Sequence, residues 1–223
     1  MLYTSKKKNL DQEIHRLCDL FTQGFVQEVL DQTKEMIKEF PTSIALLIIE
    51  GDSHTKLKQF ENGIQSYKRA IELKPDFAVS HFNLGVALQE IGNFEAALES
   101  YENAITISPS HLEAHFNIGS IKHEMGDLDA AIDSYKRILE IDPNYSKAYN
   151  NMGNALKNKG EVEEAMCCIN MAIKLKPDYS KAFLEKGILL KSFGQLQESL
   201  DAYNNALKFD PNIFEARCEK LYV

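Results

Sequence analysis

The sequence lacks any run approaching the roughly 18 apolar residues of a membrane-spanning helix, so we expect no membrane partner. Residues 1–11 also lack the apolar core of a secretory signal. Lys and Arg number 25 against 33 Asp and Glu, which gives a formal net charge of −8. Because phosphate binding requires a basic surface, this balance argues against nucleic acid as a partner. The one dense basic run, Lys6-Lys7-Lys8, belongs to residues 1–9, which we interpret as a flexible, solvated terminus.

Cysteine is scarce, and motifs for catalysis are missing. The four cysteines, Cys18, Cys167, Cys168 and Cys218, match no zinc-ligand spacing. Cys167 and Cys168 are adjacent on a predicted helix, where neighbouring side chains diverge by about 100° and do not pair easily. Reduced thiols of this kind predict a cytoplasmic location. The sequence also has no phosphate-binding glycine loop, dinucleotide motif or nucleophile elbow, so we predict a non-catalytic protein without a cofactor.

The six histidines leave two interpretations open. His111 and His115 are four residues apart, a spacing that places two imidazoles on one face of a helix and suits a metal pair. Against this, His111 falls in the loop before the helix, and His115 occupies a large inward position, as does His81. We therefore interpret these histidines as packed side chains and predict no metal site.

Proline and glycine are few but strictly placed. Each proline follows the previous one by 34 residues, and nine of the eleven glycines fall into two registers of the same period. A fixed period of this length predicts stacked supersecondary units rather than a single globular core. The prolines are Pro41, Pro75, Pro109, Pro143, Pro177 and Pro211.

The unit 78–111 illustrates the local structure that each repeat predicts. Its apolar residues recur at helical spacings in two stretches, which indicates a pair of amphipathic helices. Gly92 lies between the stretches, where a left-handed residue ends the first helix, and Asn93 is a candidate N-cap for the second. Pro109 ends the second helix because it has no N–H and clashes with the preceding turn.

Small residues at fixed places in each unit suggest that the two helices approach each other closely. In unit 78–111 we expect Gly85 and Ala97 to face each other across the helix pair. The stretches "HFNLGVALQEIGNFEAALESYENAITISP" and "AYNNMGNALKNKGEVEEAMCCINMAIKLKP" combine these small residues with the glycine and proline registers. With them, the chain resembles the tetratricopeptide-repeat (TPR) family, strongly over 44–213 and weakly over 10–43. The resemblance implies an all-α, right-handed superhelical solenoid of antiparallel helix pairs, whose concave face is lined by the first helix of each repeat.

The repeat frame divides the chain into successive segments. The first repeat is degenerate, with Leu17, Val29 and Thr33 where Gly, Ala and Tyr are expected, and we interpret it as an N-terminal cap. The last segment begins another first helix, and is either a C-terminal cap or the start of a continuing array. The predicted segments are 1–9, the capping repeat 10–43, the repeats 44–77, 78–111, 112–145, 146–179 and 180–213, and the terminal segment 214–223.

A helical wheel places positions 2, 5, 6, 9, 12 and 13 of each repeat opposite the packed positions, so these side chains should face the groove. Asparagine recurs at position 6, an arrangement similar to the asparagine ladder of O-linked N-acetylglucosamine transferase, where amides hold a peptide backbone. Two alternatives stay open: the phenylalanines could pack sideways between helices, and the lysines could form a solvated face. The candidate peptide-binding residues are Phe82, Asn83, Phe116, Asn117, Asn150, Asn151, Asn154, Lys147, Lys157, Lys181 and Lys191.

Function must therefore come from this surface. We predict a non-catalytic scaffold that binds an extended peptide or a partner helix, with the lysines favouring an acidic segment of the partner. One alternative is a substrate-recruiting region of a larger glycosyltransferase- or sulfotransferase-type enzyme, as the resemblance also implies. Self-association remains a third alternative, because the ends of a solenoid expose stackable surfaces.

Overall fold

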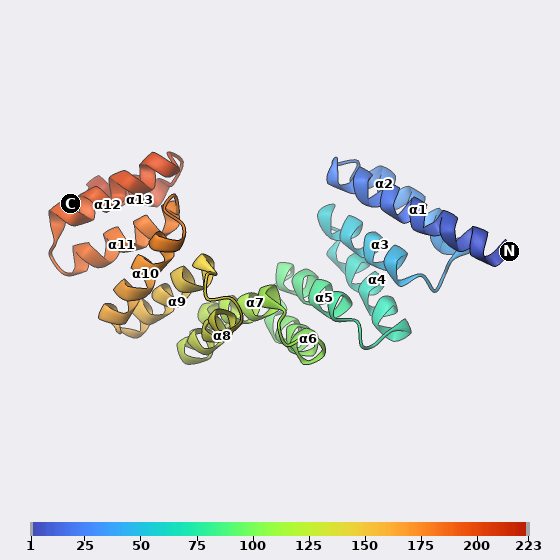
Figure 1. The fold of residues 1–223 in the computed structure, drawn as a ribbon, viewed down its shortest axis with the longest axis horizontal. Coiled ribbons are helices and arrows are strands. Elements are labelled where there is room, and N and C mark those ends of the chain that lie inside the picture. Colours follow the sequence, from blue (N-terminus) through green and yellow to red (C-terminus); the bar gives the residue numbers. More distant parts are fainter. Residues whose placement is uncertain (1, 222–223) are drawn as a thin grey trace. The chain divides into compact units, whose positions relative to one another are not determined.

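The computed structural model describes the backbone of residues 2–221 and the side chains of residues 10–221. Within this part of the chain there are thirteen α-helices and no strand (Figure 1). None of the described helices combines the length and apolar character that crossing a bilayer requires. The predicted fold class, an all-α array of antiparallel helix pairs, is confirmed.

The chain forms two compact units, residues 1–114 and residues 115–223, which we call the N-terminal and C-terminal units. In the N-terminal unit each helix packs on the next one along the chain, and the first helices α3 and α5 also touch each other. The first helix begins at Leu2, before the boundary at residue 10 that the repeat frame predicts. The helices are α1 (Leu2–Thr22), α2 (Val26–Glu39), α3 (Ile44–Lys56), α4 (Phe60–Leu73), α5 (Ala78–Glu90) and α6 (Phe94–Ile107).

The C-terminal unit repeats the same arrangement, and the boundary between the units falls inside α7. From α8 onward each helix packs on its successor, and the first helices α9, α11 and α13 contact one another in order. The helices are α7 (Leu112–Glu124), α8 (Leu128–Ile141), α9 (Ser146–Lys159), α10 (Val162–Leu175), α11 (Ser180–Ser192), α12 (Leu196–Phe209) and α13 (Phe214–Leu221).

The loops inside the helix pairs adopt the conformation that their residues predict. Gly92 has a φ of +76°, the left-handed region in which glycine has no Cβ penalty. The Asn93 side chain then accepts a hydrogen bond from the backbone N–H of Ala96 at 3.3 Å, so the predicted N-cap of α6 is confirmed. The equivalent loop in 44–77 has Lys58 instead of glycine, and Lys58 still takes a left-handed φ of +59°. The geometry of the turn therefore persists where the sequence does not favour it.

In unit 78–111 the glycine of the first helix lies against an aromatic ring of the second helix. A Cβ added at Gly85 would lie 2.6 Å from Cε1 of Tyr101, and Ala97 is not among its nearest neighbours. The Tyr101 ring is fully buried against the glycine. The aromatic ring therefore fills the space beside Gly85, while the predicted close approach of the two small positions is seen in an equivalent unit, where a Cβ at Gly153 would lie 3.2 Å from the backbone oxygen of Ala165.

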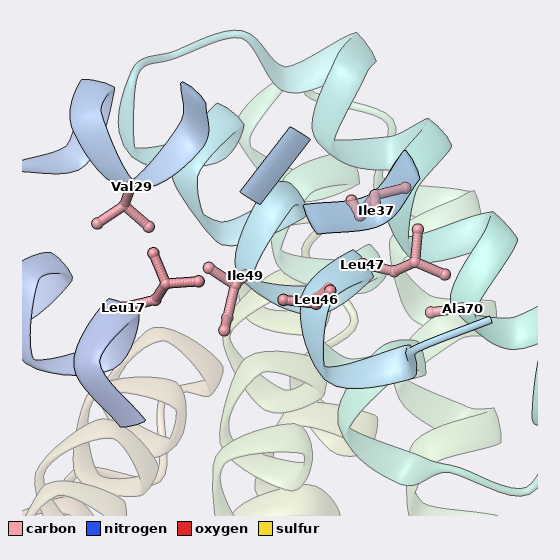
Figure 2. Close-up of a cluster of buried hydrophobic side chains, with 7 residues drawn as sticks. All are labelled: Leu17, Val29, Ile37, Leu46, Leu47, Ile49 and Ala70. Atoms are coloured by element: carbon pink, nitrogen blue, oxygen red, sulfur yellow. The ribbon is translucent and has the colours of Figure 1, made fainter. Parts of the chain in front are cut away.

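In the first repeat, the large and the small core residues are exchanged between the two helices. Leu17 replaces the glycine and Thr33 replaces the tyrosine, and both are fully buried. The bulky side chain thus comes from the first helix, whereas Gly–Tyr repeats take it from the second. Figure 2 shows the resulting cluster, which joins α1 and α2 to the next helix pair. Its members are Leu17, Val29, Ile37, Leu46, Leu47, Ile49 and Ala70.

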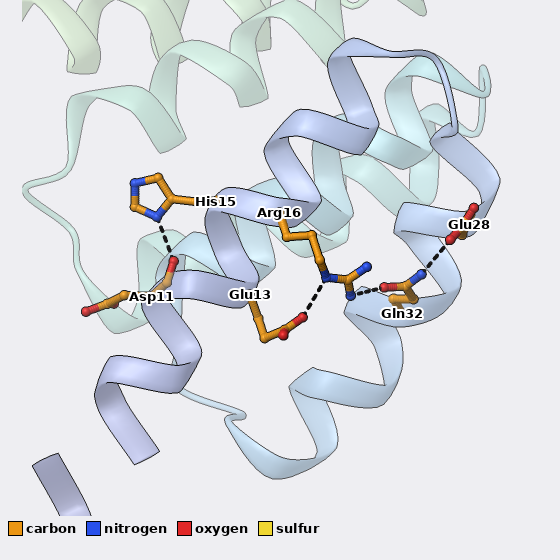
Figure 3. A network of polar contacts seen from close by, with 6 residues as sticks. All are labelled: Asp11, Glu13, His15, Arg16, Glu28 and Gln32. Atoms are coloured by element: carbon orange, nitrogen blue, oxygen red, sulfur yellow. Dashed lines mark hydrogen bonds and ion pairs between the residues drawn. The ribbon is translucent and has the colours of Figure 1, made fainter. Parts of the chain in front are cut away.

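A polar network connects the surfaces of α1 and α2 (Figure 3). Arg16 donates to Glu13 at 2.8 Å on its own helix and reaches across to the side-chain oxygen of Gln32 on α2. Gln32 in turn donates to Glu28 at 2.9 Å. The Arg16 and Glu13 side chains are 48% and 39% exposed, so water screens their ion pair and we expect it to contribute little to stability. The role of 10–43 as a capping repeat remains a prediction.

Candidate interaction surface

A hollow of about 420 Å³ opens in the N-terminal unit between the first helices of two successive repeats. α5 contributes Phe82, Asn83 and Val86 to its wall, and α3 contributes Asp52 and Thr55. All five occupy positions that the helical wheel assigns to the groove. The structure thus brings predicted groove positions from two repeats together around one cavity.

Asp52 is the residue at this hollow that sequence reasoning missed. Its Oδ1 accepts hydrogen bonds from the Tyr67 hydroxyl at 2.7 Å and from the Asn83 amide at 2.9 Å. Burial raises the pKa of the Asp52 carboxyl, and the two hydrogen bonds act in the opposite direction. The sequence did hold one sign of this: Asp52 is the ninth residue of repeat 44–77, a position that the helical wheel assigns to the groove. Asn83, expected to hold a peptide backbone, therefore already donates one hydrogen bond within the chain.

The two predicted phenylalanines are half-buried among other aromatic side chains. The Phe82 ring lies 4.6 Å from the His111 ring and 5.7 Å from the Tyr101 ring, measured between centroids. Phe116 lies 6.0 Å from Tyr135 in the same way. These contacts favour the alternative in which the rings pack sideways, although one side of Phe82 still lines the hollow. His111 is thus part of an aromatic contact, and among the described residues no cluster of three or more His, Cys, Asp and Glu could hold a metal.

The predicted asparagines are divided between accessible and enclosed positions. Asn150 is only 3% exposed and donates to Asn151 at 3.3 Å, so its amide is not available on the surface. Asn151 and Asn154 are half-buried on the same helix, α9, and Asn117 is half-buried on α7. The side-chain oxygens of Asn150 and Asn154 are enclosed without a hydrogen-bond partner among the described atoms. The predicted asparagines therefore do not form a continuous row of amides that are all free to bind a peptide.

The four predicted lysines also fall into two kinds. Lys157 Nζ lies 2.6 Å from Glu185, which is at position 6 of the next first helix. Lys191 repeats this relationship with Glu219 at 3.1 Å. Lys147 and Lys181 are exposed and form no ion pair with any side chain of residues 10–221. Two of the four positive charges are thus compensated inside the array.

Another hollow, of about 520 Å³, lies in the C-terminal unit between α8, α9 and α10. Its floor is apolar, with Ile132 and Leu156, and its rim is crossed by Lys159, which bridges Asp129 and Glu161 at 2.7 Å each. None of the predicted groove residues lines it.

All four cysteines of the chain are free thiols.

Family models match the chain in the same frame as the repeats. A TPR-repeat model matches residues 51–92 and 119–160, and tetratricopeptide-repeat models match 78–111 and 146–179. Together these matches span 51–111 and 119–179, which is more than half of the sequence. The chain belongs to the tetratricopeptide-repeat family. A search of the curated proteins finds no match.

Solved structures of TPR proteins share this fold at low sequence identity. Pseudomonas aeruginosa PilF has a TM-score of 0.84 at 15% identity, with 98% of this chain and all of that chain covered. MamA has a TM-score of 0.67 at 24% identity, covering 72% of this chain and 94% of that one. YrrB, described as a TPR protein with an unusual peptide-binding site, has a TM-score of 0.67 at 18% identity and covers 85% and 97%. At these identities the likeness establishes the fold of the array.

Proposed function

We propose that this TPR chain is a protein-interaction scaffold, which binds an extended peptide or a helix of a partner along the face formed by its first helices. The observation that carries the proposal is the hollow between α3 and α5, because successive first helices wall it at their groove positions. Apolar side chains such as Val86 offer contact area there, and Asp52 and Asn83 offer polar groups. A concave, mostly apolar surface with a few convergent polar groups is the usual form of a binding site.

The test is selection of ligands from a library of random linear peptides displayed against the purified chain. Val86→Glu would place a charge on the wall of the hollow, and should weaken binding of the selected peptides by at least about tenfold. Glu99→Lys on α6 is the matched control, because Glu99 is exposed and does not line the hollow. Peptides that bind both variants as well as the unmodified chain would contradict the proposal.

For the C-terminal unit, the proposal includes an acidic segment of the ligand lying near Lys147 and Lys181. These two lysines are exposed and without carboxylate partners among the described side chains, whereas Lys157 and Lys191 are paired. Lys147→Glu/Lys181→Glu should therefore weaken acidic peptides at low salt, with the difference shrinking at high salt. Equal binding by the double variant at both salt concentrations would remove this part of the proposal.

A further inference from the structure

The carboxylate of Asp52 has no cationic partner within the described side chains. Its Oδ1 accepts two hydrogen bonds, from Tyr67 and Asn83, but Oδ2 accepts none. Oδ2 is not an enclosed orphan atom either, and Asp52 forms part of the wall of the 420 Å³ hollow. A partly desolvated carboxylate is normally paired with a cation, because taking it out of water alone is costly. The hollow thus contains one carboxylate oxygen, Asp52 Oδ2, without a hydrogen-bond donor, and no described cationic side chain pairs with that carboxylate.

The other walls of the hollow suit a cation of a particular kind. Three phenylalanine rings, Phe21, Phe60 and Phe82, line it together with Asp52 and the Tyr67 ring. The face of an aromatic ring attracts cations electrostatically. Because the Asn83 amide nitrogen donates to Asp52, its side-chain oxygen is left as a second acceptor in the same wall.

The chain's own positive charges do not neutralise this carboxylate. Lys56 follows Asp52 by one helical turn and Lys58 lies in the next loop, and both line the hollow. Both are exposed, and neither forms an ion pair with Asp52. Exposed ammonium groups are strongly hydrated and screened by salt, so they interact weakly with a group set inside the wall. Glu90, also exposed on the wall, adds a second negative charge.

We infer that this hollow takes the arginine side chain of a polypeptide partner, with guanidinium N–H groups donating to Asp52 Oδ2 and to the Asn83 side-chain oxygen. A guanidinium is planar, weakly hydrated and rich in donors, so it matches two acceptors beside aromatic walls better than a lysine ammonium does. The inference rests on the proposed scaffold function and names the chemistry that one of its hollows recognises.

The test titrates the full chain with N-acetyl-arginine amide, and in parallel with the corresponding amides of lysine and of citrulline, the neutral isostere of arginine. Binding is followed by NMR, through the side-chain amide signals of Asn83. We expect saturable shifts with the arginine amide, an affinity at least about tenfold weaker for the lysine amide, and no shifts with the citrulline amide. The arginine affinity should fall as salt is raised.

Two variants separate recognition from folding. Asp52→Asn keeps an oxygen for the hydrogen bonds from Tyr67 and Asn83, and should remain folded while losing arginine binding by at least about tenfold. Lys56→Gln, at the same hollow, removes a competing positive charge and should bind arginine as well as or better than the unmodified chain. Retained binding by a folded Asp52→Asn variant, equal shifts with citrulline, or lysine binding as tight as arginine would each overturn the inference.

These outcomes are distinct from those that test the scaffold function. If arginine amide fails to bind but library peptides still depend on Val86, the chain binds partners through this face without an arginine site. If neither dependence exists, both the scaffold surface and the arginine site are wrong.

Discussion

Lys157 Nζ lies 2.6 Å from Glu185 Oε2, and this contact joins the first helices α9 and α11 of two successive repeats. The side chains are 24% and 16% exposed, so the pair is partly shielded from water. Lys191 and Glu219 repeat the relationship between α11 and α13. Charges on this face therefore connect adjacent repeats.

Breaking this pair should reveal a measurable coupling. Lys157→Met leaves Glu185 without its cation and should lower the free energy of unfolding by about 1 kcal/mol. In a double-mutant cycle with Glu185→Gln, we expect a coupling of about 0.5–1 kcal/mol from urea unfolding. The control is Lys38–Glu35, which has the same 2.6 Å separation but 70% and 72% exposure, and should show almost no coupling. Equal coupling in the two pairs would mean that burial does not strengthen the first.

Asp52→Asn should stabilise the chain in a manner that depends on pH. Because burial raises the pKa of Asp52 in the folded state, the folded state binds more protons than the unfolded state between the ordinary and the raised values. The stability of the unmodified chain therefore falls as the pH rises through that window. At neutral pH the variant should be more stable by on the order of 1 kcal/mol, and the difference should vanish below about pH 4.

Urea unfolding at several pH values measures this difference. Glu99→Gln on the exposed face of α6 is the control, and should change stability little at any pH. If the stability difference between Asp52→Asn and the unmodified chain instead increased as the pH falls, desolvation of the Asp52 carboxylate would not be its cause.

Gly119→Ala should destabilise the C-terminal unit through overpacking. The new Cβ would lie 2.7 Å from Cε1 of Tyr135, whose ring is fully buried, so the ring or one of the two helices would have to shift. We expect a loss of about 1–3 kcal/mol in urea unfolding. Gly126→Asn is the control, because no atom lies within 4 Å of that position and Asn tolerates the left-handed φ of +82°. Similar losses for the two variants would show that the tyrosine contact is not what requires glycine at 119.

Lys58→Gly should stabilise the N-terminal unit. Lys58 holds a left-handed φ of +59°, which costs a residue with a Cβ about 1 kcal/mol, and glycine adopts it freely. After the greater entropy of glycine in the unfolded chain is subtracted, we expect a gain of about 0.5 kcal/mol in thermal or urea unfolding. The reverse change in the equivalent loop, Gly92→Lys, should destabilise by about 1 kcal/mol. A gain from both substitutions would exclude backbone strain as the cause.

The sequence by itself determined the repeat frame and the local structure inside it. Gly92 is left-handed and Asn93 caps α6, as the sequence predicts, because both outcomes depend on the backbone preferences of a few adjacent residues. The 34-residue spacing of the prolines likewise predicted the repeat length, since every unit ends its second helix by the same local mechanism. Contacts between side chains were harder to predict, and the sequence analysis did not place the Tyr101 ring against Gly85.

Only the tertiary structure decided which groove side chains are already engaged. Asp52 and Asn83 are 31 residues apart, and Lys157 and Glu185 are 28 apart, so each pair forms only when first helices of successive repeats pack side by side. A helical wheel gives the direction of a side chain but not its distance from a side chain on the next helix, which depends on axis separation and rotamer. For that reason the sequence placed Asn83 and Lys157 on the groove face, whereas packing made each a hydrogen-bond partner of the neighbouring repeat and left the Asp52 oxygen open.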